Sequence, residues 1–415
     1  MRGDVRSVAG YIAPLEGMRG AAVLWVVAFH YVALRDALVP RDPWIEALRH
    51  APVLDAFVRN GYLGVDLFFL ISGFLLALPW LAGAREGEPA PSAGAFYVRR
   101  ARRIVPAYYV QLFVLFAVVM PLLHGRAYWR SDLYVDAWNA VAHALFLQNT
   151  SPLTSAAMGA NGALWTLAVE AQFYALLPLA APLFVRAPFA MLGASLAASV
   201  LWQWQAASGM QPIVDAGMHL GAHWHWSAQT MRRLLAMQLP GFLGHFALGI
   251  VLGRAWLARR DCPPMRGTAL AHGLAVLLAG VLLYASFTGA ILPGAPWLAR
   301  ELSALALGVL LFAAASSRGA AVRSLLARGP LAFAGRVSYS AYLYHLPLLL
   351  LFNAYAPASG GWVSLPAFAA ALASVSWLSW RYVERPFLRT RLPVPVQPAI
   401  NDSDPFIARG SGSRR

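Results

Sequence analysis

The first candidate for chemistry is a cation and an imidazole on one apolar segment near the start of the chain. Arg19 and His30 are eleven residues apart. On a helix this is nearly a whole number of turns, so both side chains share one face about 16 Å apart along the axis. Ionisable groups inside hydrocarbon indicate function by default. The two side chains could lie along a cofactor that enters the membrane. Alternatively, Arg19 could be an interfacial anchor and His30 a packed, hydrogen-bonded histidine.

A carboxylate follows in the second apolar segment. Residues 61–74 read GYLGVDLFFLISGF, so Asp66 and Ser72 stand among glycines and aromatic residues. Glycines in such a segment permit close helix approach. Asp66 could orient or charge-stabilise His30, as a carboxylate does for a catalytic imidazole. The alternative is a structural cap at the mouth of the helix.

A second acid stands in residues 165–174, WTLAVEAQFY. Thr166, Glu170 and Tyr174 recur every four positions, so the three side chains share one helical face. Glu170 could be a general acid or base in a buried setting. It could equally be a hydrogen-bonded carboxylate that holds helices together.

Four arginines precede the third apolar segment. Arg99 with Arg102 and Arg100 with Arg103 have the i, i+3 spacing that aligns side chains on a helix. Guanidinium groups bind phosphate oxygens bidentately, so this edge suits a polyphosphate such as coenzyme A. Anchoring of the helix by basic residues on the cytoplasmic side is the alternative.

Other polar groups predict structure rather than catalysis. Ser338, Tyr342 and His345 form a stripe, and residues 384–387, ERPF, follow the last apolar segment; we expect structural roles for them. Three histidines at 219, 223 and 225 have partly metal-like spacing, but no carboxylate pattern completes a site, so no metal is predicted.

The elements that carry these residues are membrane spans. Of the 415 residues 59% are hydrophobic and 12% are charged, about half the charged fraction of a soluble domain. Apolar stretches long enough to cross a bilayer recur along the chain. The predicted spans are 18–38, 61–82, 104–123, 168–186, 188–207, 236–257, 268–287, 298–317, 335–355 and 363–383. The expected fold is an all-α, polytopic bundle of about ten transmembrane helices.

The charge pattern predicts an orientation for the bundle. All 33 basic residues are arginines, and ten spans with both termini in the cytoplasm place 24 of them inside. Arginines spread over short loops favour a membrane and its lipids as the partner, and not nucleic acid. The single cysteine, Cys262, excludes an intramolecular disulfide. We expect one membrane domain over residues 1–387 and a disordered cytoplasmic tail over 388–415.

Taken in order, these motifs resemble the acyltransferase-3 family of bacterial membrane O-acyltransferases over essentially the whole chain. The family's arginine, ten residues and histidine resemble Arg19 to His30. Its glycine-valine-aspartate run resembles residues 64–69, its double-arginine segment residues 99–106, and its tryptophan-to-tyrosine element residues 165–174. The serine-tyrosine-serine and histidine element matches residues 338–345, and Glu384 with Pro386 matches the closing signature.

This resemblance implies an enzyme of the bacterial inner membrane with ten core helices. The donor would be acetyl-CoA or another acyl-CoA, a substrate and not a tightly bound cofactor, and the acceptor a hydroxyl of a carbohydrate or lipid-linked sugar. The resemblance puts His30 at the reaction centre, Glu170 near it, and Arg19 with the 99–103 arginines toward coenzyme A. The short tail differs from the family members that append an extra hydrolase-like domain, which we do not expect here. A transporter that uses the same His, Asp and Glu residues as a relay is the alternative.

Overall fold

The computed structural model describes residues 12–39, 42–125, 133–150, 161–220, 227–262, 268–317, 319–356 and 360–389. Within these ranges the chain is helical and contains no strand, which confirms the predicted all-α class. The long helices are α2 (Ala13–Leu38), α5 (Leu63–Glu86), α6 (Ala93–Val114), α9 (Trp165–Arg186), α10 (Pro188–Ser208), α13 (Leu243–Arg259), α14 (Thr268–Phe287), α15 (Pro296–Ser316), α18 (Ser338–Tyr355) and α19 (Gly361–Ser379).

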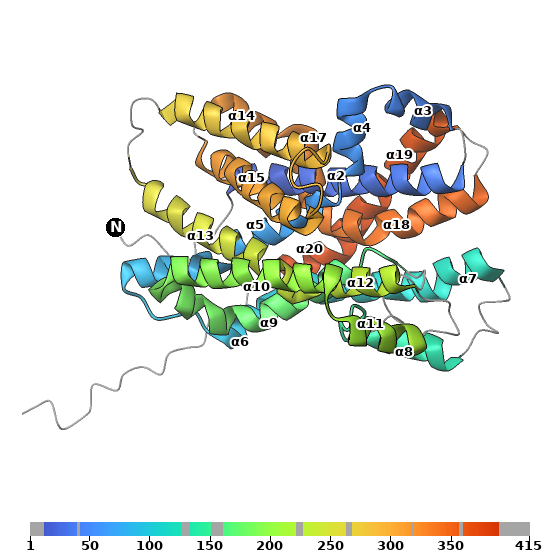
Figure 1. Ribbon diagram of the computed structural model, residues 1–415, viewed down its shortest axis with the longest axis horizontal. Coiled ribbons are helices and arrows are strands. Elements are labelled where there is room, and N and C mark those ends of the chain that lie inside the picture. The colour runs from blue at the N-terminus through green and yellow to red at the C-terminus, as the bar shows by residue number, and fades with distance from the viewer. Residues whose placement is uncertain are drawn as a thin grey trace, which may run out of the picture.

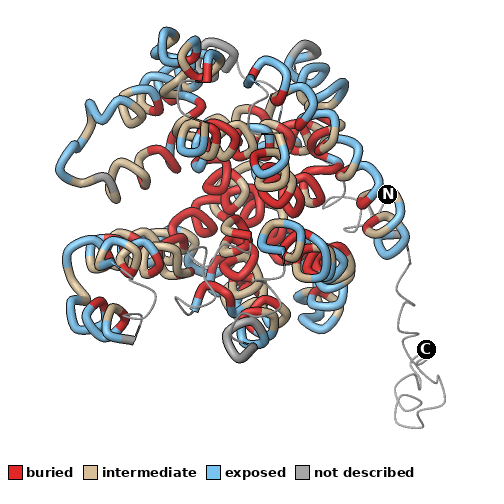
Figure 2. The backbone as a smooth tube through the Cα atoms, turned by 90° about the vertical axis from the view of Figure 1, so that its right-hand side faces the viewer, coloured by how far each residue is buried: buried red, intermediate tan, exposed pale blue. Residues whose placement is uncertain are grey.

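Shorter helices connect or extend these. They are α3 (Pro43–Arg49), α4 (Pro52–Arg59), the π-helix η1 (Leu115–Val119), α7 (Met120–His124), α8 (Leu133–Ala144), α11 (Gln211–Leu220), α12 (Ala228–Ala236), the 3₁₀ helix η5 (Leu239–Phe242), α16 (Ala320–Ala327), α17 (Gly329–Arg336), the π-helix η6 (Trp380–Glu384) and α20 (Arg385–Arg389). Figure 1 shows α2, α14, α15, α18 and α19 on one side of the molecule and α6, α9 and α10 on the other. Figure 2 shows the buried residues gathered at the centre.

The predicted spans all coincide with helices. Within the described residues, seven helical segments are long and apolar enough to cross a membrane: 13–38, 63–86, 93–124, 165–186, 239–259, 297–316 and 361–388. The other three predicted spans correspond to α10, α14 and α18. Large apolar side chains stand exposed on the outer faces, among them Phe113, which is 70% exposed, and Phe189, which is 77% exposed. Such surface suits lipid rather than water.

Glycines allow α5 to contact its neighbours closely. A Cβ at Gly64 would lie 2.5 Å from the carbonyl oxygen of Ala22 in α2. A Cβ at Gly73 would lie 2.1 Å from the carbonyl oxygen of Phe246 in α13, the helix against which α5 packs most extensively. No side chain fits in either space, so the two glycines fix the crossings that bring the polar residues of α2, α5 and α13 together.

A buried ion pair holds the end of α2 in place. Arg35 donates from Nε and Nη2 to Oδ2 of Asp42, at 3.0 and 2.8 Å, and from Nη1 to Oδ1 of Asn353 in α18 at 3.3 Å. Oδ1 of Asp42 accepts from the backbone N–H of Trp44 at 2.9 Å, which caps α3, and from that of Gly361 at 3.2 Å. One carboxylate therefore ties together α2, α3 and α19.

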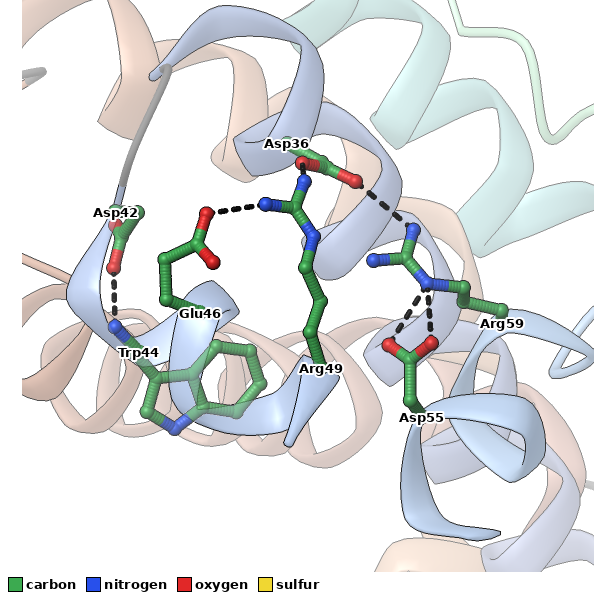
Figure 3. A network of polar contacts seen from close by, with 7 residues as sticks. All are labelled: Asp36, Asp42, Trp44, Glu46, Arg49, Asp55 and Arg59. Carbon is green, nitrogen blue, oxygen red and sulfur yellow. Dashed lines mark hydrogen bonds and ion pairs between the residues drawn. The ribbon is translucent and has the colours of Figure 1, made fainter. Parts of the chain in front are cut away.

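A more exposed network lies beside this pair. Figure 3 shows Asp36 between the guanidinium groups of Arg49 and Arg59, with Asp55 on the far side of Arg59. Asp36 accepts from Arg49 at 2.5 Å and from Arg59 at 2.9 Å. These contacts join the end of α2 to α3 and α4. The short helices thus form a fixed cover over this end of the bundle.

Candidate active site

Two histidines meet in the interior, from helices far apart in the sequence. Nδ1 of His30 on α2 lies 3.3 Å from Nε2 of His345 on α18, and the ring centroids are 4.9 Å apart. His345 is fully buried, whereas His30 is only partly buried. The sequence pattern predicts a structural role for His345, but its position against His30 makes it a candidate for the reaction centre as well.

Backbone carbonyls fix the protonation pattern of this pair. Nδ1 of His345 lies 2.7 Å from the carbonyl oxygen of Tyr342, and Nδ1 of His30 lies 3.0 Å from that of Val26. A carbonyl oxygen can only accept, so both Nδ1 atoms carry hydrogen in the neutral rings. Nε2 of His345 is then free to accept from His30, and Nε2 of His30 retains its lone pair. His30 therefore presents a basic nitrogen.

A cavity of about 90 Å³ lies between α2, α5, α6, α9 and α18. Its polar lining residues are Arg19, Ser72, Arg100, Arg103, Thr166, Glu170, Tyr174, Ser338, Tyr339 and Tyr342. The predicted common face of Thr166, Glu170 and Tyr174 is confirmed, because all three line this cavity. His30 and His345 do not line it. Tyr342 joins the two regions, since its ring lies 5.5 Å from that of His345.

Hydrogen bonds order the carboxylate and the hydroxyl groups of the cavity. Ser72 Oγ donates to Oε1 of Glu170 at 2.7 Å. The hydroxyl groups of Thr166 and Tyr342 lie 2.6 Å apart, and that of Tyr342 also lies 2.8 Å from the carbonyl oxygen of Ala163. These contacts bring α5, α9 and α18 together, so Glu170 is held by partners from outside its own helix.

The cavity carries excess positive charge. Arg19, Arg100 and Arg103 line it together with a single carboxylate, Glu170. Nε of Arg100 is buried and has no hydrogen-bond partner within the described ranges. Of the four predicted arginines on α6, Arg100 and Arg103 line the cavity, whereas Arg99 and Arg102 do not. A phosphate-bearing ligand at this end would therefore meet one of the two predicted i, i+3 pairs.

Glu384 lies on η6, directly after α19, and contacts Arg103 of the cavity lining. It is buried on η6, accepts a hydrogen bond from Ser340 Oγ, and has its Oε2 atom 3.7 Å from Nη1 of Arg103. Arg103 is thus drawn toward α19 as well as toward the cavity. This position agrees with the structural role predicted for residues 384–387.

Asp66 pairs with a different partner from the predicted one. Nε and Nη2 of Arg300 on α15 donate to its two oxygens at 3.0 and 2.6 Å, and Nε2 of His245 on α13 lies 3.8 Å away. Among the described residues, His30 forms hydrogen bonds with Val26 and His345 and none with Asp66. The expectation that Asp66 orients His30 is corrected, because the fold directs its carboxylate to α15.

Three polar residues were not selected from the sequence: His245 and Glu301, which are buried, and Arg300, which is partly buried. His245 lies between two acids, with Nδ1 3.8 Å from Oε2 of Glu301. The signal that could have found them was their placement inside the apolar stretches at 236–257 and 298–317.

The described residues contain no group of three metal-binding side chains. Of the three loop histidines, His219 lies on α11, and positions 223 and 225 lie outside the described residues. The candidate centre is therefore the histidine pair with the arginine-rich cavity.

Comparison with known proteins places this arrangement in a family. Residues 12–381 match the acyltransferase-3 family model, described as an acyltransferase domain. The peptidoglycan O-acetyltransferase OatA of Listeria monocytogenes is 24% identical over 93% of this chain and 57% of its own length. The putative peptidoglycan O-acetyltransferase YrhL of Bacillus subtilis is 26% identical, over 82% of this chain and 49% of YrhL.

A third relative is matched over most of its own length. The exopolysaccharide production protein ExoZ of Rhizobium meliloti is 29% identical over 79% of this chain and 90% of ExoZ. The chain thus spans about half the length of OatA and YrhL and most of ExoZ. No solved structure matches significantly.

Proposed function

This chain belongs to the acyltransferase-3 family, and on that premise we propose that it is a membrane O-acetyltransferase. Its donor is cytoplasmic acetyl-CoA, and its acceptor is a hydroxyl of a carbohydrate on the extracytoplasmic side of a bacterial inner membrane. The single observation that carries the proposal is the histidine pair that leaves Nε2 of His30 basic, next to a cavity lined by three arginines.

The arginine-lined cavity supports the choice of donor. Three guanidinium groups line the cavity together with one carboxylate, which favours an anion with several phosphate oxygens. Nε of Arg100 is buried and has no acceptor among the described residues. A cavity of about 90 Å³ is smaller than a whole nucleotide cofactor. It suits the acyl-thioester end, with the phosphates held by arginines at its entrance.

Nε2 of His30 is the general base in the proposed reaction. It takes the proton of the acceptor hydroxyl while the hydroxyl oxygen bonds to the thioester carbonyl carbon. The carbon–sulfur bond then breaks, and the thiolate takes the proton from the imidazolium. The products are the ester and coenzyme A. His345 accepts a hydrogen bond from Nδ1 of His30 and so spreads the positive charge that the base acquires.

The rival proposal was a transporter that uses the same polar residues as a relay. The family match and two of the relatives favour acyl transfer, since OatA and YrhL are named as O-acetyltransferases. The excess of arginine at the cavity favours it too, because a proton relay needs no polyphosphate site. The proposed orientation has both termini in the cytoplasm, so the donor enters at the Arg100 end.

The test uses purified protein in detergent with radiolabelled acetyl-CoA. His30→Ala should retain binding of acetyl-CoA and lose its turnover. Arg100→Gln should weaken binding about tenfold or more, because one charge-assisted hydrogen bond is removed. Arg259→Gln, on the exposed end of α13 and outside the cavity lining, is the matched control and should bind normally.

Two results would oppose the proposal. Folded wild-type protein that binds no acyl-CoA would remove the donor and leave transport as the better reading. Turnover that survives His30→Ala would remove the base assigned here, while leaving the donor site intact.

A further inference from the structure

A second cavity lies away from the arginine-rich one, beside a buried charge cluster. Asp66 and His245 are buried in the first turns of α5 and α13, and Glu301 is buried in the second turn of α15; Arg300 is held bidentately by Asp66. Removing paired charges from water is costly, and an apolar replacement is often as stable. The cluster is therefore more easily explained by a binding role than by stability.

The cavity is small and combines flat rings with polar groups. Its volume is about 130 Å³, and its lining includes Asn60, Tyr62, Ser286, Phe287, Arg300 and Ser303. Asp66 accepts from Nε and Nη2 of Arg300, and Nη1 donates no hydrogen bond within the described part of the chain. Oγ of Ser286 is likewise buried without a described partner. Donors and acceptors are thus available to a ligand.

Charge distinguishes this cavity from the donor cavity. Arg300 is the one cation among the described residues that line it, and the carboxylate of Asp66 neutralises it at 2.6 Å. A phosphate group would need cations in excess of carboxylates. The cavity with Arg19, Arg100 and Arg103 provides this excess even though Arg103 also pairs with Glu384. An uncharged ligand that offers several hydroxyl groups and a flat apolar face fits amide, hydroxyl, guanidinium and aromatic walls.

Aromatic rings connect this cavity to the histidine pair and separate it from the donor cavity. Tyr62 lies 5.9 Å from the ring of Phe29, which lies 5.0 Å from the ring of His30. On the other side, Arg300 stands 4.7 Å over Phe242, whose ring lies 5.0 Å from that of Phe69 in the donor cavity. The two cavities therefore have separate walls, with His30 one ring away from this one.

Resting on the proposed function, we propose that this second cavity binds an uncharged saccharide unit of the acceptor. Arg300, held by Asp66, donates from Nη1 to a sugar hydroxyl, and Tyr62 supports the face of the ring. The acceptor hydroxyl thereby reaches Nε2 of His30 from one side while the thioester reaches it from the other.

The experiment measures acetyl transfer from acetyl-CoA to p-nitrophenyl glycosides of glucose, galactose and N-acetylglucosamine, with the glucuronide as the charged comparison. Acetyl-CoA binding and its slow hydrolysis are recorded in parallel. Tyr62→Ala and Arg300→Lys should each raise KM for the neutral glycosides about tenfold or more, because a contact or a bidentate pair is lost. Binding and hydrolysis of acetyl-CoA should stay unchanged. Tyr355→Ala, an exposed tyrosine outside the lining, is the control.

The outcomes separate this inference from the proposed function. Wild-type protein that binds no acetyl-CoA overturns the proposed function and, with it, this inference. Protein that hydrolyses acetyl-CoA but accepts only the glucuronide, or no glycoside, overturns the saccharide site alone. Unchanged KM in both variants also overturns it. If Arg300→Lys does not fold, Tyr62→Ala decides, because Tyr62 is partly exposed and outside the ion pair.

Discussion

Removal of the Asp42 carboxylate should unfold one end of the bundle. Asp42 and Arg35 are 2% and 1% exposed, so neither charge is reached by water. The carboxylate accepts four hydrogen bonds, two from Arg35 and one each from the backbone N–H groups of Trp44 and Gly361. Asp42→Ala leaves the guanidinium buried without its counter-ion and removes the cap of α3.

The expected loss is about 3–5 kcal/mol, the usual result of removing one partner of a buried pair. The neighbouring network provides the matched control. Asp36 is paired with Arg49 and Arg59, whose side chains are 44% and 35% exposed. Exposed pairs contribute about 0–1 kcal/mol each. Because Asp36 forms two such pairs, Asp36→Ala should be the milder change by about 1 kcal/mol or more.

The assay is the free energy of unfolding of purified protein in mixed micelles, measured by titration with a denaturing detergent. Asp42→Asn belongs in the series because the amide oxygen still accepts hydrogen bonds but carries no charge. Its stability should fall between those of the wild type and Asp42→Ala. Equal losses for Asp42→Ala and Asp36→Ala would refute the reasoning, since burial would then not decide the result.

The same carboxylate predicts a pH dependence. Burial alone would raise the pKa of Asp42, but the hydrogen bonds from Arg35, Trp44 and Gly361 outweigh it and hold this pKa below the ordinary 3.8. A folded-state pKa below the unfolded one gives stability that is fully present above the unfolded value and is lost as pH falls through the folded value. The difference between wild type and Asp42→Asn should be constant near neutrality and shrink below about pH 4. A difference that grows on acidification would contradict this sign.

Three further predictions concern packing, the base and the donor. Gly73→Ala should destabilise the protein by at least about 2 kcal/mol by pushing α5 off α13, whereas Gly280→Ala, with open space at its Cβ, should not; thermal unfolding in detergent compares them. His345→Phe should lower kcat about 100-fold with little change in KM for acetyl-CoA, and His345→Gln should restore part of it because an amide oxygen can accept from His30; steady-state kinetics decide. Acetyl-CoA affinity should fall as salt rises from 0.05 to about 0.5 M, and a flat titration would exclude the arginine site.

Much of the helical framework could be predicted from the sequence, for a physical reason. A membrane-spanning helix is recognised in a sequence as about twenty consecutive apolar residues, the length that crosses the hydrocarbon core. It forms a helix because its backbone groups must be hydrogen-bonded within the segment. The ten predicted spans therefore coincide with helices, and only their ends differ; the span predicted at 104–123 belongs to a helical segment that starts at Ala93. The face shared by Thr166, Glu170 and Tyr174 followed likewise from helical period alone.

Contacts between helices follow from different information. The period of α5 places Asp66 on a face but does not say whether α2 or α15 packs against it. That choice depends on where the backbones come closest, which Gly64 and Gly73 determine by admitting Ala22 and Phe246.

Once α5 lies against α13, Asp66 is within reach of His245 and Arg300, and His30 is left to meet His345. Single-sequence reasoning therefore found candidate residues for the centre and misassigned one pairing. The effect of the α5–α13 crossing on this pairing can be tested. If the crossing directs Asp66 to Arg300, then Gly73→Ala should raise KM for the acceptor by a larger factor than it weakens the binding of acetyl-CoA.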